Sequence, residues 1–456
     1  MSERTPSPEP SAPAVPTLPG AVPGLGHLPR MRNFLDFLTT LPAHGDLVTL
    51  RVGPAEVIVA CSAAAAHEIL RRGEDFDKGG QFFERAREVV GNSLTTCRHD
   101  EHRLQRRLIQ PAFHKQRLAD YAVHMSAEFG AMSDRWRSGA TVDVTAETMT
   151  VVAKILARTM FRRDTGVLGD MRQVLDDIDT LVAVAAKRML LPAPLTRLPT
   201  PDNRRYLAAS RRLRALISAA AATGRAAGGD SADLLSVLLT ARDGDTGLSD
   251  TDIVDQLLLF QIAGIDTTAT ALAWALWLIG TRPDVQRRLH DEVDTVLSGA
   301  HPATHEHLPR LTYTRHVVAE TLRRYPPVWI LTRTAMADTT LGRYAIPAGA
   351  TLAVSPYLLH HRPDLYPSPS GFDPGRWEWD RDLPAGAYLP FGYGARRCIG
   401  EHFALAELTL ALASITARWR VRPTPALVER PPRPRLAASL RPPRLPMILE
   451  SRTPAT

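Results

Sequence analysis

Residues 391–400 read Phe-Gly-Tyr-Gly-Ala-Arg-Arg-Cys-Ile-Gly and place one cysteine in a glycine-rich loop, directly after two arginines. Residues 400–410 are apolar at helical spacing, which predicts a helix that begins just after Cys398. A thiolate there would be stabilised by the free N–H groups and the dipole of the helix N-terminus. We expect Gly394 and Gly400 to let the backbone approach closely whatever the sulfur binds. The alternative is a small, buried cysteine without chemistry, the usual state of a free thiol.

The pattern Phe-x-x-Gly-x-Arg-x-Cys-x-Gly resembles, at every defined position, the haem-binding loop of the cytochrome P450 superfamily. The chain as a whole resembles the soluble bacterial members of this family of actinobacterial type. The resemblance implies haem b (iron protoporphyrin IX) as the cofactor and Cys398 as the ligand of its iron. A thiolate ligand donates electron density to the iron and favours O–O cleavage. Phe391 would cover the sulfur side of the haem, and the N–H groups of Ile399 and Gly400 could hydrogen-bond the sulfur.

A second motif, Ala-Gly-Ile-Asp-Thr-Thr at 263–268, lies inside a long apolar stretch at 249–280 that predicts a buried core helix. Glycine within a helix costs about 1 kcal/mol relative to alanine. A buried aspartate adds a desolvation cost, and such local violations are typical of functional sites. The resemblance implies that Gly264 helps to leave a groove over the haem for O₂, and that Asp266 and Thr267 relay protons. The alternative is a kinked helix whose threonine hydroxyls bond the preceding turn.

A third group of residues predicts a buried charged network. Glu320 and Arg323 share one face of a predicted helix, a spacing that is also common on ordinary surfaces. The resemblance adds a later arginine, Arg376, in the sequence Phe-Asp-Pro-Gly-Arg-Trp at 372–377. These three residues would form a structural network that locks the cysteine loop to the core, and removal of one partner would cost roughly 3–5 kcal/mol.

Four cationic side chains match positions that bind the haem propionates in related enzymes. His102 and Arg106 lie one helical turn apart, in the pattern His-x-x-x-Arg. Arg333 and Arg396 match two further propionate-binding positions of the family. For His102 the alternative is a surface histidine on a basic helix.

The expected substrate-contact regions follow from position in the family, at about 79–96, 183–198, 260–268, 328–331 and 437–440. The side chains in these regions are largely apolar, which favours a hydrophobic small molecule as the substrate. Core packing uses the same residue types. The predicted pocket residues are Phe82, Phe83, Phe260, Ala263, Val328, Trp329, Ile330 and Ala438.

The composition is that of a globular protein with a large core. The chain has 456 residues, of which 44% are hydrophobic and 23% charged. Three cysteines cannot form a disulfide framework, which favours a reducing compartment. The net charge is +7, but only four of the basic residues are lysines and the arginines are scattered. Without a dense basic tract, nucleic acid is not an expected partner.

The order of elements along the chain predicts a leader of about 20 residues followed by one catalytic domain. Residues 1–20 are rich in proline and alanine, read as a flexible leader, and contain no apolar run for a membrane anchor. Short β-branched runs at 47–52 and 57–60 predict a hairpin. Helical periodicity dominates 62–297, with strands expected at 341–346 and 351–354. The acidic sequence at 176–180 is interpreted as a solvated helix face.

The resemblance covers essentially the whole chain and implies the cytochrome P450 fold over residues 21–456. This fold is mainly α with a smaller β region, a triangular prism with the haem between the long central helix and the helix after the cysteine loop. Its expected activity is monooxygenation, the hydroxylation or epoxidation of a hydrophobic small molecule with O₂. A terpenoid is the first substrate expected, and a polyketide or fatty acid the second.

The end of the chain at Thr456 leaves no reductase domain, so the expected electron source is NAD(P)H through a separate ferredoxin with its reductase, or a flavodoxin. A basic face around Arg103, Arg106, Arg107 and Lys115, together with Arg397, could dock such an acidic carrier. We expect a cytoplasmic monomer without a membrane anchor. Alternatives are a peroxide-driven peroxygenase, an oxygen-independent isomerase or dehydratase, and a haem-based ligand sensor. The Asp266–Thr267 pair argues against all of these.

Overall fold

The computed structural model describes residues 12–161, 170–189, 193–196, 198–226, 233–378 and 382–452. The chain forms two compact units, each assembled from separate stretches of sequence. Unit 1 takes its residues from Met1–Gly80, Ile330–Pro367 and Leu383–Arg397, and unit 2 from Gln81–Trp329, Ser368–Asp382 and Cys398–Thr456. Residues 21–456, predicted as one catalytic domain, therefore divide between two packing units.

Unit 1 is built on a five-stranded sheet with the strand order β1-β2-β10-β7-β3. The strands are β1 (Leu47–Val52), β2 (Ala55–Ala60), β3 (Phe76–Asp77), β7 (Leu331–Ala335) and β10 (Thr351–Val354). The predicted hairpin is confirmed, because β1 and β2 pair antiparallel along their whole length. Strand β7 pairs antiparallel with β10 and β3, so Asp77 lies opposite Thr334, the neighbour of Arg333.

Smaller elements complete unit 1. Its helices are α1 (Phe34–Thr40), α2 (Ala63–Arg71) and α14 (Pro356–His360), and its second sheet pairs β8 (Thr339–Leu341) with β9 (Tyr344–Ile346). The sequence analysis expected one strand over 341–346. The structure instead turns at Gly342, whose φ of 55° is a conformation that favours glycine, and so forms a hairpin.

Part of the predicted leader is bound to unit 1. Thr17 forms a bridge with Thr49 of β1, and the amide of Leu18 donates to the Thr49 carbonyl at 3.0 Å. Leu18 is buried. The edge of an open sheet exposes backbone groups that need partners, and this segment supplies them. Residues 12–20, which were expected to belong to a flexible leader, are therefore held in place over 13–18, while 1–11 lie outside the described residues.

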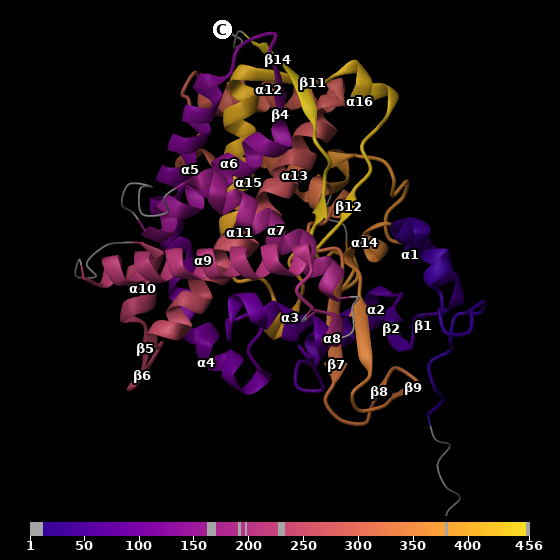
Figure 1. Cartoon of the computed structure of the whole chain (residues 1–456). Helices are drawn as coiled ribbons and strands as arrows, with labels where there is room; N and C mark the ends of the chain where they lie inside the picture. The colour runs from indigo at the N-terminus through magenta and orange to yellow at the C-terminus, as the bar shows by residue number, and fades with distance from the viewer. Residues whose placement is uncertain are drawn as a thin grey trace, which may run out of the picture. The chain divides into compact units, whose positions relative to one another are not determined.

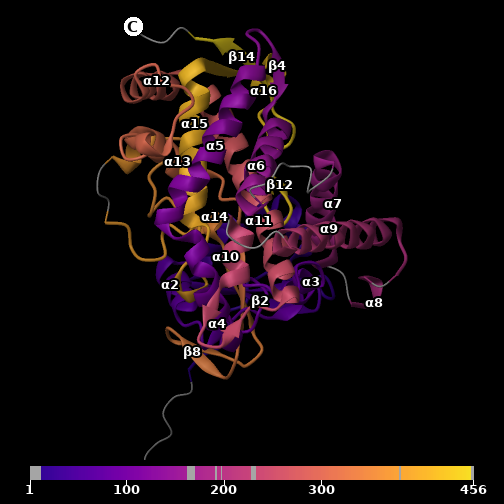
Figure 2. The same cartoon turned by 90° about the vertical axis from the view of Figure 1, so that its left-hand side faces the viewer.

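Unit 2 is largely helical. Its longer helices are α3 (Gly80–Val90), α4 (His99–Ile109), α5 (Lys115–Arg135), α6 (Val144–Phe161), α7 (Met171–Met189), α9 (Pro201–Ala226), α11 (Asp250–Gly280), α12 (Pro283–Leu297), α13 (Thr312–Arg324) and α15 (Glu401–Arg418). Its shorter helices are α8 (Ala193–Thr196), α10 (Leu234–Thr240) and α16 (Pro425–Glu429). Figure 1 shows α11 packed between α6 and α15, and Figure 2 shows α7 and α9 side by side.

The strands of unit 2 are short. A three-stranded sheet joins β11 (Trp419–Pro423), β14 (Pro446–Ser451) and β4 (Thr141–Asp143). Two hairpins pair β5 (Arg242–Asp243) with β6 (Thr246–Gly247), and β12 (Arg435–Leu436) with β13 (Leu440–Arg441). The second hairpin matters for the site because it carries Arg441 to the middle of α11.

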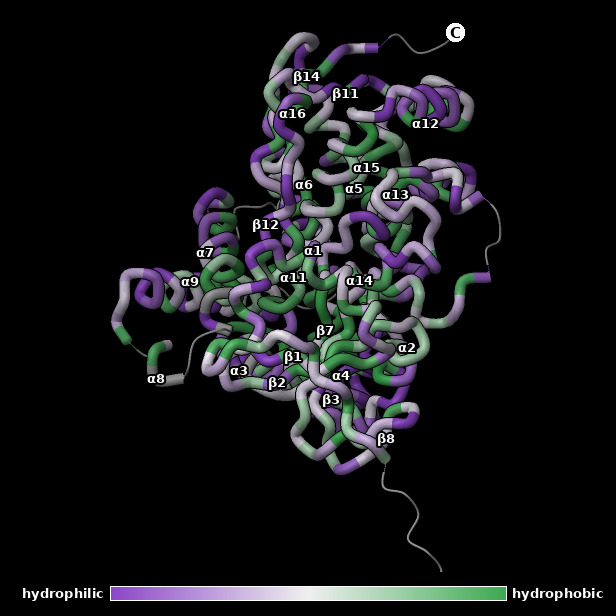
Figure 3. The backbone as a smooth tube through the Cα atoms, turned by 90° about the vertical axis from the view of Figure 1, so that its right-hand side faces the viewer, coloured by the Kyte–Doolittle hydropathy of each residue, from purple (hydrophilic) through white to green (hydrophobic). Residues whose placement is uncertain are grey.

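Helix α11 confirms the long helix predicted over 249–280. Ser249 caps it, since its hydroxyl accepts from the Asp252 amide while the Asp252 carboxylate accepts from the Ser249 amide. The helix is apolar on almost every side, and its colour in Figure 3 is mostly that of hydrophobic residues, unlike the hydrophilic α12. Among the described residues it is the one helix long and apolar enough to cross a membrane, but 78% of its most apolar window is buried in the protein. It is therefore the core of unit 2.

Candidate active site

The cysteine loop is fixed in unit 1 before it reaches Cys398. Its short 3-10 helix, Gly394–Arg396, packs against α2. Gly394 has φ +71°, and a Cβ there would lie 2.3 Å from the Leu70 carbonyl oxygen. Only glycine fits this position, because a side chain would be strained and would collide with backbone. The sequence analysis assigned this glycine to the sulfur's ligand, whereas the structure uses it to seat the loop on α2. Phe391, expected beside the sulfur, is half-buried in the same loop.

In unit 2, Cys398 lies just before helix α15, as predicted. Gly400 is the N-cap residue and the helix begins at Glu401. Cys398 is exposed, which rules out the alternative of a buried structural cysteine. A Cβ on Gly400 would meet the Cys398 Sγ and a Phe113 ring carbon at 3.9 Å, which is ordinary contact, so the glycine is not required for space. Its place at the helix N-terminus still favours a thiolate at Cys398.

Phe113 connects the cysteine end of α15 with α11. Its ring approaches Gly400 and packs edge-on against the Phe260 ring, with 5.0 Å between the two ring centroids. Phe260 is buried within the hydrophobic core of unit 2. Phe113 was not among the predicted site residues, although it follows the His-x-x-x-Arg helix in the sequence Pro-Ala-Phe at 111–113.

The middle of α11 carries a strip of exposed and half-buried residues on a helix that is otherwise buried from 253 to 280. Ala263 is exposed, and Ile262, Gly264 and Thr267 are half-buried. The strip coincides with the predicted motif. A Cβ on Gly264 would lie 3.0 Å from the Leu156 side chain of α6, so this glycine permits close packing with α6. The uncovered surface is therefore formed by Ala263 and Thr267 more than by Gly264.

The two predicted relay residues have different partners. The Thr267 hydroxyl donates to the Ala263 carbonyl at 2.7 Å, which is the bond to the preceding turn expected from the alternative interpretation. Asp266 is buried and accepts a hydrogen bond from Nε of Arg441 at 2.5 Å. Arg441 comes from β13, and the sequence analysis did not connect it with the site. Asp266 thus has a cationic partner where the sequence suggested an isolated buried acid.

Glu407 on α15 is a further buried acid that the sequence analysis missed. It is 2% exposed and hydrogen-bonds Thr268, the residue after Thr267. Its Oε1 atom has no hydrogen-bond partner among the described residues. Burial raises the pKa of the Glu407 carboxyl to about 8, and the Thr268 hydrogen bond offsets this only in part. A signal was present in the sequence, because Glu407 interrupts the apolar run of 400–410.

Unit 1 holds a buried cluster of two predicted propionate ligands. Arg396 donates through NH2 to the Asp77 carboxylate at 2.8 Å, and both side chains are at most 5% exposed. Arg333 is also buried and donates to the neighbouring carbonyl of Thr332 at 2.8 Å. Desolvation, and then the nearby charge of Arg396, lower the pKa of the Arg333 guanidinium to about 10. This cluster has two guanidinium groups for one carboxylate, which suits an additional anion.

Helix α4 carries the other two predicted propionate ligands in unit 2. His102 is buried and Arg106 is half-buried, one turn later on the same helix. The alternative of a surface histidine at 102 is excluded by this burial. Arg103 and Arg107 point to the exposed side of the same helix, and Arg107 pairs with Asp243 at 3.0 Å.

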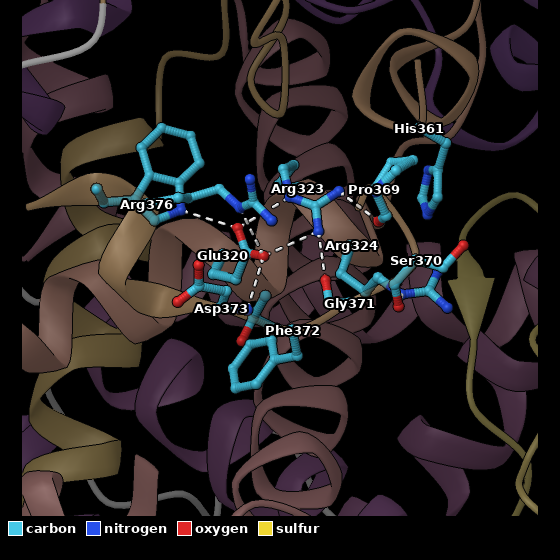
Figure 4. Close-up of polar contacts among 12 residues, drawn as sticks. Glu320, Arg323, Arg324, His361, Pro369, Ser370, Gly371, Phe372, Asp373 and Arg376 are labelled. Atoms are coloured by element: carbon cyan, nitrogen blue, oxygen red, sulfur yellow. Dashed lines mark hydrogen bonds and ion pairs between the residues drawn. The ribbon is translucent and has the colours of Figure 1, made fainter. Parts of the chain in front are cut away.

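The predicted Glu320 network is present and closed. Arg323 donates to both carboxylate oxygens of Glu320, at 2.9 and 2.8 Å, and Arg376 donates at 3.0 Å. Figure 4 shows Glu320 at the centre of these contacts. Two donors that the sequence analysis did not name, the Trp377 indole at 2.9 Å and the Asp373 amide at 3.0 Å, complete its coordination.

The network binds a different segment from the one expected. Arg323 also donates to the carbonyls of Pro369 and Gly371, at 2.9 and 2.8 Å, and Arg324 donates to that of Ser370 at 3.1 Å. Its hydrogen bonds therefore join α13 to residues 369–377, where the sequence analysis expected a lock on the cysteine loop. The reason is that the open carbonyls of this irregular segment need donors.

Two of the predicted substrate-contact regions, 328–331 and 437–440, are joined by hydrogen bonds and lie against α11. The Trp329 indole donates to the Ala437 carbonyl at 3.1 Å, and the Leu440 amide donates to the Pro327 carbonyl at 2.8 Å. Leu440 in turn accepts from the Trp274 indole of α11 at 2.8 Å. The segments 327–329 and 437–440 are thereby placed beside α11. Val328, Trp329 and Ile330 are half-buried, Ala438 is exposed and Phe83 is buried, whereas the Phe82 side chain lies outside the described residues.

Comparison with known proteins shows the family. A sequence profile described as Cytochrome P450 matches residues 16–449. The haem domain in a crystal structure of cytochrome P450DA superposes with a TM-score of 0.86 and 25% sequence identity, covering 97% of this chain and 98% of that one. The chain belongs to the cytochrome P450 family and has its fold.

Relatives of known activity come from Streptomyces. Cyclooctat-9-en-7-ol 5-monooxygenase of Streptomyces melanosporofaciens is 42% identical over 417 residues, which is 90% of each chain. Pentalenene oxygenase of Streptomyces avermitilis is 40% identical over 443 residues, 96% of this chain and 98% of that protein. The chain is therefore a cytochrome P450 monooxygenase with a haem-thiolate cofactor.

The side chains of the structure fit such a cofactor. Cys398 presents an exposed sulfur at a helix N-terminus, and α11 leaves an uncovered apolar strip at Ala263 within the same unit. The buried excess of positive charge at Arg333 and Arg396 is the complement of an anionic propionate.

Proposed function

We propose that this enzyme hydroxylates or epoxidises a terpenoid, at a haem held by Cys398. The observation that carries the site is the exposed Cys398 at the start of α15, together with the uncovered strip of α11. The substrate class is supported by the two Streptomyces relatives, whose names refer to cyclooctat-9-en-7-ol and pentalenene. Both names refer to compounds of terpenoid type, and the apolar residues of the predicted pocket suit such a substrate.

In this proposal the chain's own side chains would hold the haem. Cys398 would ligate the iron, and the helix N-terminus favours the thiolate form of its sulfur. His102, Arg106, Arg333 and Arg396 would bind the propionates. When bound, the haem supplies the activation of O₂ with two electrons, and the thiolate favours O–O cleavage.

The protons for the reaction enter through α11. Asp266 holds a buried carboxylate near the uncovered strip, and Thr267 presents a hydroxyl on that strip. The Thr267 hydroxyl donates its proton to the Ala263 carbonyl, and its oxygen lone pairs stay available. The hydroxyl oxygen can therefore accept a hydrogen bond from a group on the uncovered strip. Thr267→Ala is expected to retain haem and to lower the yield of product per NAD(P)H several-fold.

The substrate would lie over the strip of α11, against side chains from four segments. Phe260 and Ala263 belong to α11, Val328, Trp329 and Ile330 to the segment before β7, and Ala438 to the β12–β13 hairpin. Phe82 and Phe83 of α3 complete the proposed pocket. Because these side chains are apolar, they orient the substrate by shape and exclude water.

Electrons are proposed to come from NAD(P)H through a separate ferredoxin with its reductase, or a flavodoxin. The exposed Arg103 of α4 and the nearby Lys115 of α5 offer a basic surface for an acidic carrier. A monomer in the cytoplasm is the proposed form and place of action.

The test of the proposal is spectroscopic. Wild-type protein and Cys398→Ser are produced with a haem precursor, reduced with dithionite and exposed to CO. A red-shifted Soret band of thiolate type in the wild type alone supports ligation by Cys398. The same band in Cys398→Ser, or wild-type protein without haem, would contradict it. Pentalenene and cyclooctat-9-en-7-ol are then titrated, and a substrate-induced spin-state shift supports a terpenoid substrate, with a fatty acid as the comparison.

A further inference from the structure

We propose that Arg441 is a positioning residue for Asp266, and that Asp179 on α7 competes for the same guanidinium group. The position of α7 then sets how firmly Asp266 is held. This inference rests on the proposed function, because it concerns the proton relay assigned to Asp266. All three side chains belong to described segments of unit 2.

The guanidinium of Arg441 contacts one carboxylate on each side. Its Nε donates to Oδ1 of Asp266 at 2.5 Å, and NH2 forms an ion pair with the same oxygen. Its NH1 donates to Oδ1 of Asp179. One cation thus joins α11 to α7. Because a guanidinium stays charged at all ordinary pH values, this contact fixes the direction of the Asp266 carboxylate.

The backbone beside Arg441 is fixed on both sides, so the side chain is placed in advance. The Leu440 carbonyl accepts from the Trp274 indole of α11, and the Leu440 amide donates to the Pro327 carbonyl, both at 2.8 Å. Arg441 itself pairs with Arg435 across the β12–β13 hairpin. Because the backbone at Arg441 is already fixed, the Arg441–Asp266 contact costs little additional conformational entropy when it forms.

The two contacts of Arg441 differ in burial. The Asp266 side chain is 6% exposed, that of Arg441 15% and that of Asp179 66%. A buried ion pair is hard to break, because separation leaves a desolvated charge. An exposed pair contributes little and is screened by solvent and salt. Motion of α7 can therefore change the Arg441–Asp179 contact at small cost, while the Arg441–Asp266 contact persists.

A competition follows from this geometry. With Asp179 in place, part of the guanidinium's hydrogen bonding and charge is directed away from Asp266. When α7 moves so that the Arg441–Asp179 contact is lost, Arg441 interacts with Asp266 alone, and the Arg441–Asp266 ion pair becomes stronger. A carboxylate held by the Nε–H donor and the positive charge of Arg441 is less free to turn toward Thr267 and carry a proton. Contact between α7 and Arg441 is thus expected to favour release of Asp266.

The first test measures the free energy of unfolding of the haem-loaded enzyme and needs no substrate. Double-mutant cycles combine Arg441→Met with Asp266→Asn, and Arg441→Met with Asp179→Asn. The Arg441–Asp266 coupling is expected to change the unfolding equilibrium constant at least about tenfold. The Arg441–Asp179 coupling is expected to be about twofold. In an Asp179→Asn background, the Arg441–Asp266 coupling should increase about twofold more.

Two variants serve as matched controls. Asp176→Asn removes an exposed acid one turn earlier on α7, and Arg435→Met removes the arginine opposite Arg441 in the hairpin. Neither should couple to Asp266. If the Arg441–Asp266 coupling is unchanged by Asp179→Asn, or is changed equally by Asp176→Asn, the competition is wrong. Arg441→Lys replaces Arg441→Met should the latter fail to fold, with a smaller coupling expected because lysine lacks the fork of donors.

The second test measures proton delivery during turnover, with pentalenene and cyclooctat-9-en-7-ol as substrates and a generic ferredoxin–reductase pair. Asp179→Asn is expected to slow product formation about twofold and to raise the solvent deuterium isotope effect, because Asp266 is held more firmly. Asp176→Asn should match the wild type in both. A structural role for Arg441 alone would not change the isotope effect.

The outcomes separate this inference from the proposed function. If Asp266→Asn leaves both the rate and the isotope effect unchanged, the relay assigned to Asp266 fails, whatever the Arg441 variants show. If Asp266→Asn slows turnover but Asp179→Asn behaves like Asp176→Asn, the relay stands and the competition fails. Where neither terpene is oxidised, the unfolding measurements decide.

Discussion

Two buried clusters in this protein each contain two arginines and one acidic residue, but they differ in how fully their charges are paired. In unit 2, Glu320 lies between Arg323 and Arg376. In unit 1, Asp77 pairs with Arg396 beside Arg333. Each combines two guanidinium groups with one carboxylate.

The difference lies in what else receives the guanidinium N–H groups. Arg323 donates to both oxygens of Glu320 and to the carbonyls of Pro369 and Gly371. Arg333 donates to the carbonyl of its own neighbour, and burial beside Arg396 lowers its pKa to about 10. The first cluster is complete without a ligand and holds the chain together. The second carries buried positive charge that an anion would stabilise, as expected of a propionate site.

The largest effect is expected from opening the complete cluster. Glu320→Gln leaves two buried guanidinium groups without a counter-charge, and should lower the free energy of unfolding by roughly 3–5 kcal/mol. The loss should be equal with and without haem, since the hydrogen bonds of Glu320 within the described part of the chain go to α13 and to residues 373–377. Urea denaturation followed by circular dichroism measures both. A loss confined to the haem-loaded form would assign Glu320 to the cofactor site instead.

A buried acid without a cation sharpens the comparison. The pKa of Glu407 is raised to about 8, above its unfolded value of 4.5, so the folded state holds this proton more strongly. Its contribution to stability is therefore complete below about pH 4.5 and is lost as the pH rises toward 8.

Glu407→Gln keeps the shape and removes the titration. At pH 4 the variant should match the wild type within about 0.5 kcal/mol, and at pH 9 it should be more stable by up to about 4–5 kcal/mol. Denaturation curves at both pH values measure this difference. Parallel pH profiles for the two proteins would show that Glu407 ionises without cost.

A third effect is expected on cofactor retention at the incomplete cluster. Arg333→Met removes one buried charge that has no carboxylate of its own, so the stability of the haem-free protein should change by less than about 1 kcal/mol. Haem retention should fall about tenfold, because one propionate loses a charge-assisted hydrogen bond. Haem transfer to apomyoglobin measures the loss rate. An unchanged loss rate would remove Arg333 from the propionate site.

The smallest effect is expected at the edge of the complete cluster. Arg324 donates to the Ser370 carbonyl from a more exposed position than Arg323. Arg324→Ala should therefore cost less than about 1 kcal/mol. The same urea denaturation serves as the measurement, and a cost comparable with that of Glu320→Gln would show that the network does not end at Arg323.

The sequence predicted the local features of this protein well. The 400–410 periodicity located the helix after Cys398, and Ser249 located the start of α11. These features depend on residues close in sequence, whose spacing alone decides which side of a helix is apolar and which residue caps it. The family resemblance carried the ligand, the network and the activity.

The tertiary structure decided which distant groups meet. Asp77 lies opposite Arg396, and Arg441 reaches Asp266 and Asp179, across separations that no local pattern encodes. It also reassigned Gly394 to the Leu70 carbonyl and placed Glu407 beside Thr268 without a cation. Burial and charge pairing depend on the packing of many elements. Arginines therefore complete the hydrogen bonding of the Glu320 cluster but leave excess positive charge in the Asp77 cluster. The sequence determined the residues that do chemistry, and only the fold determined the charges that surround them.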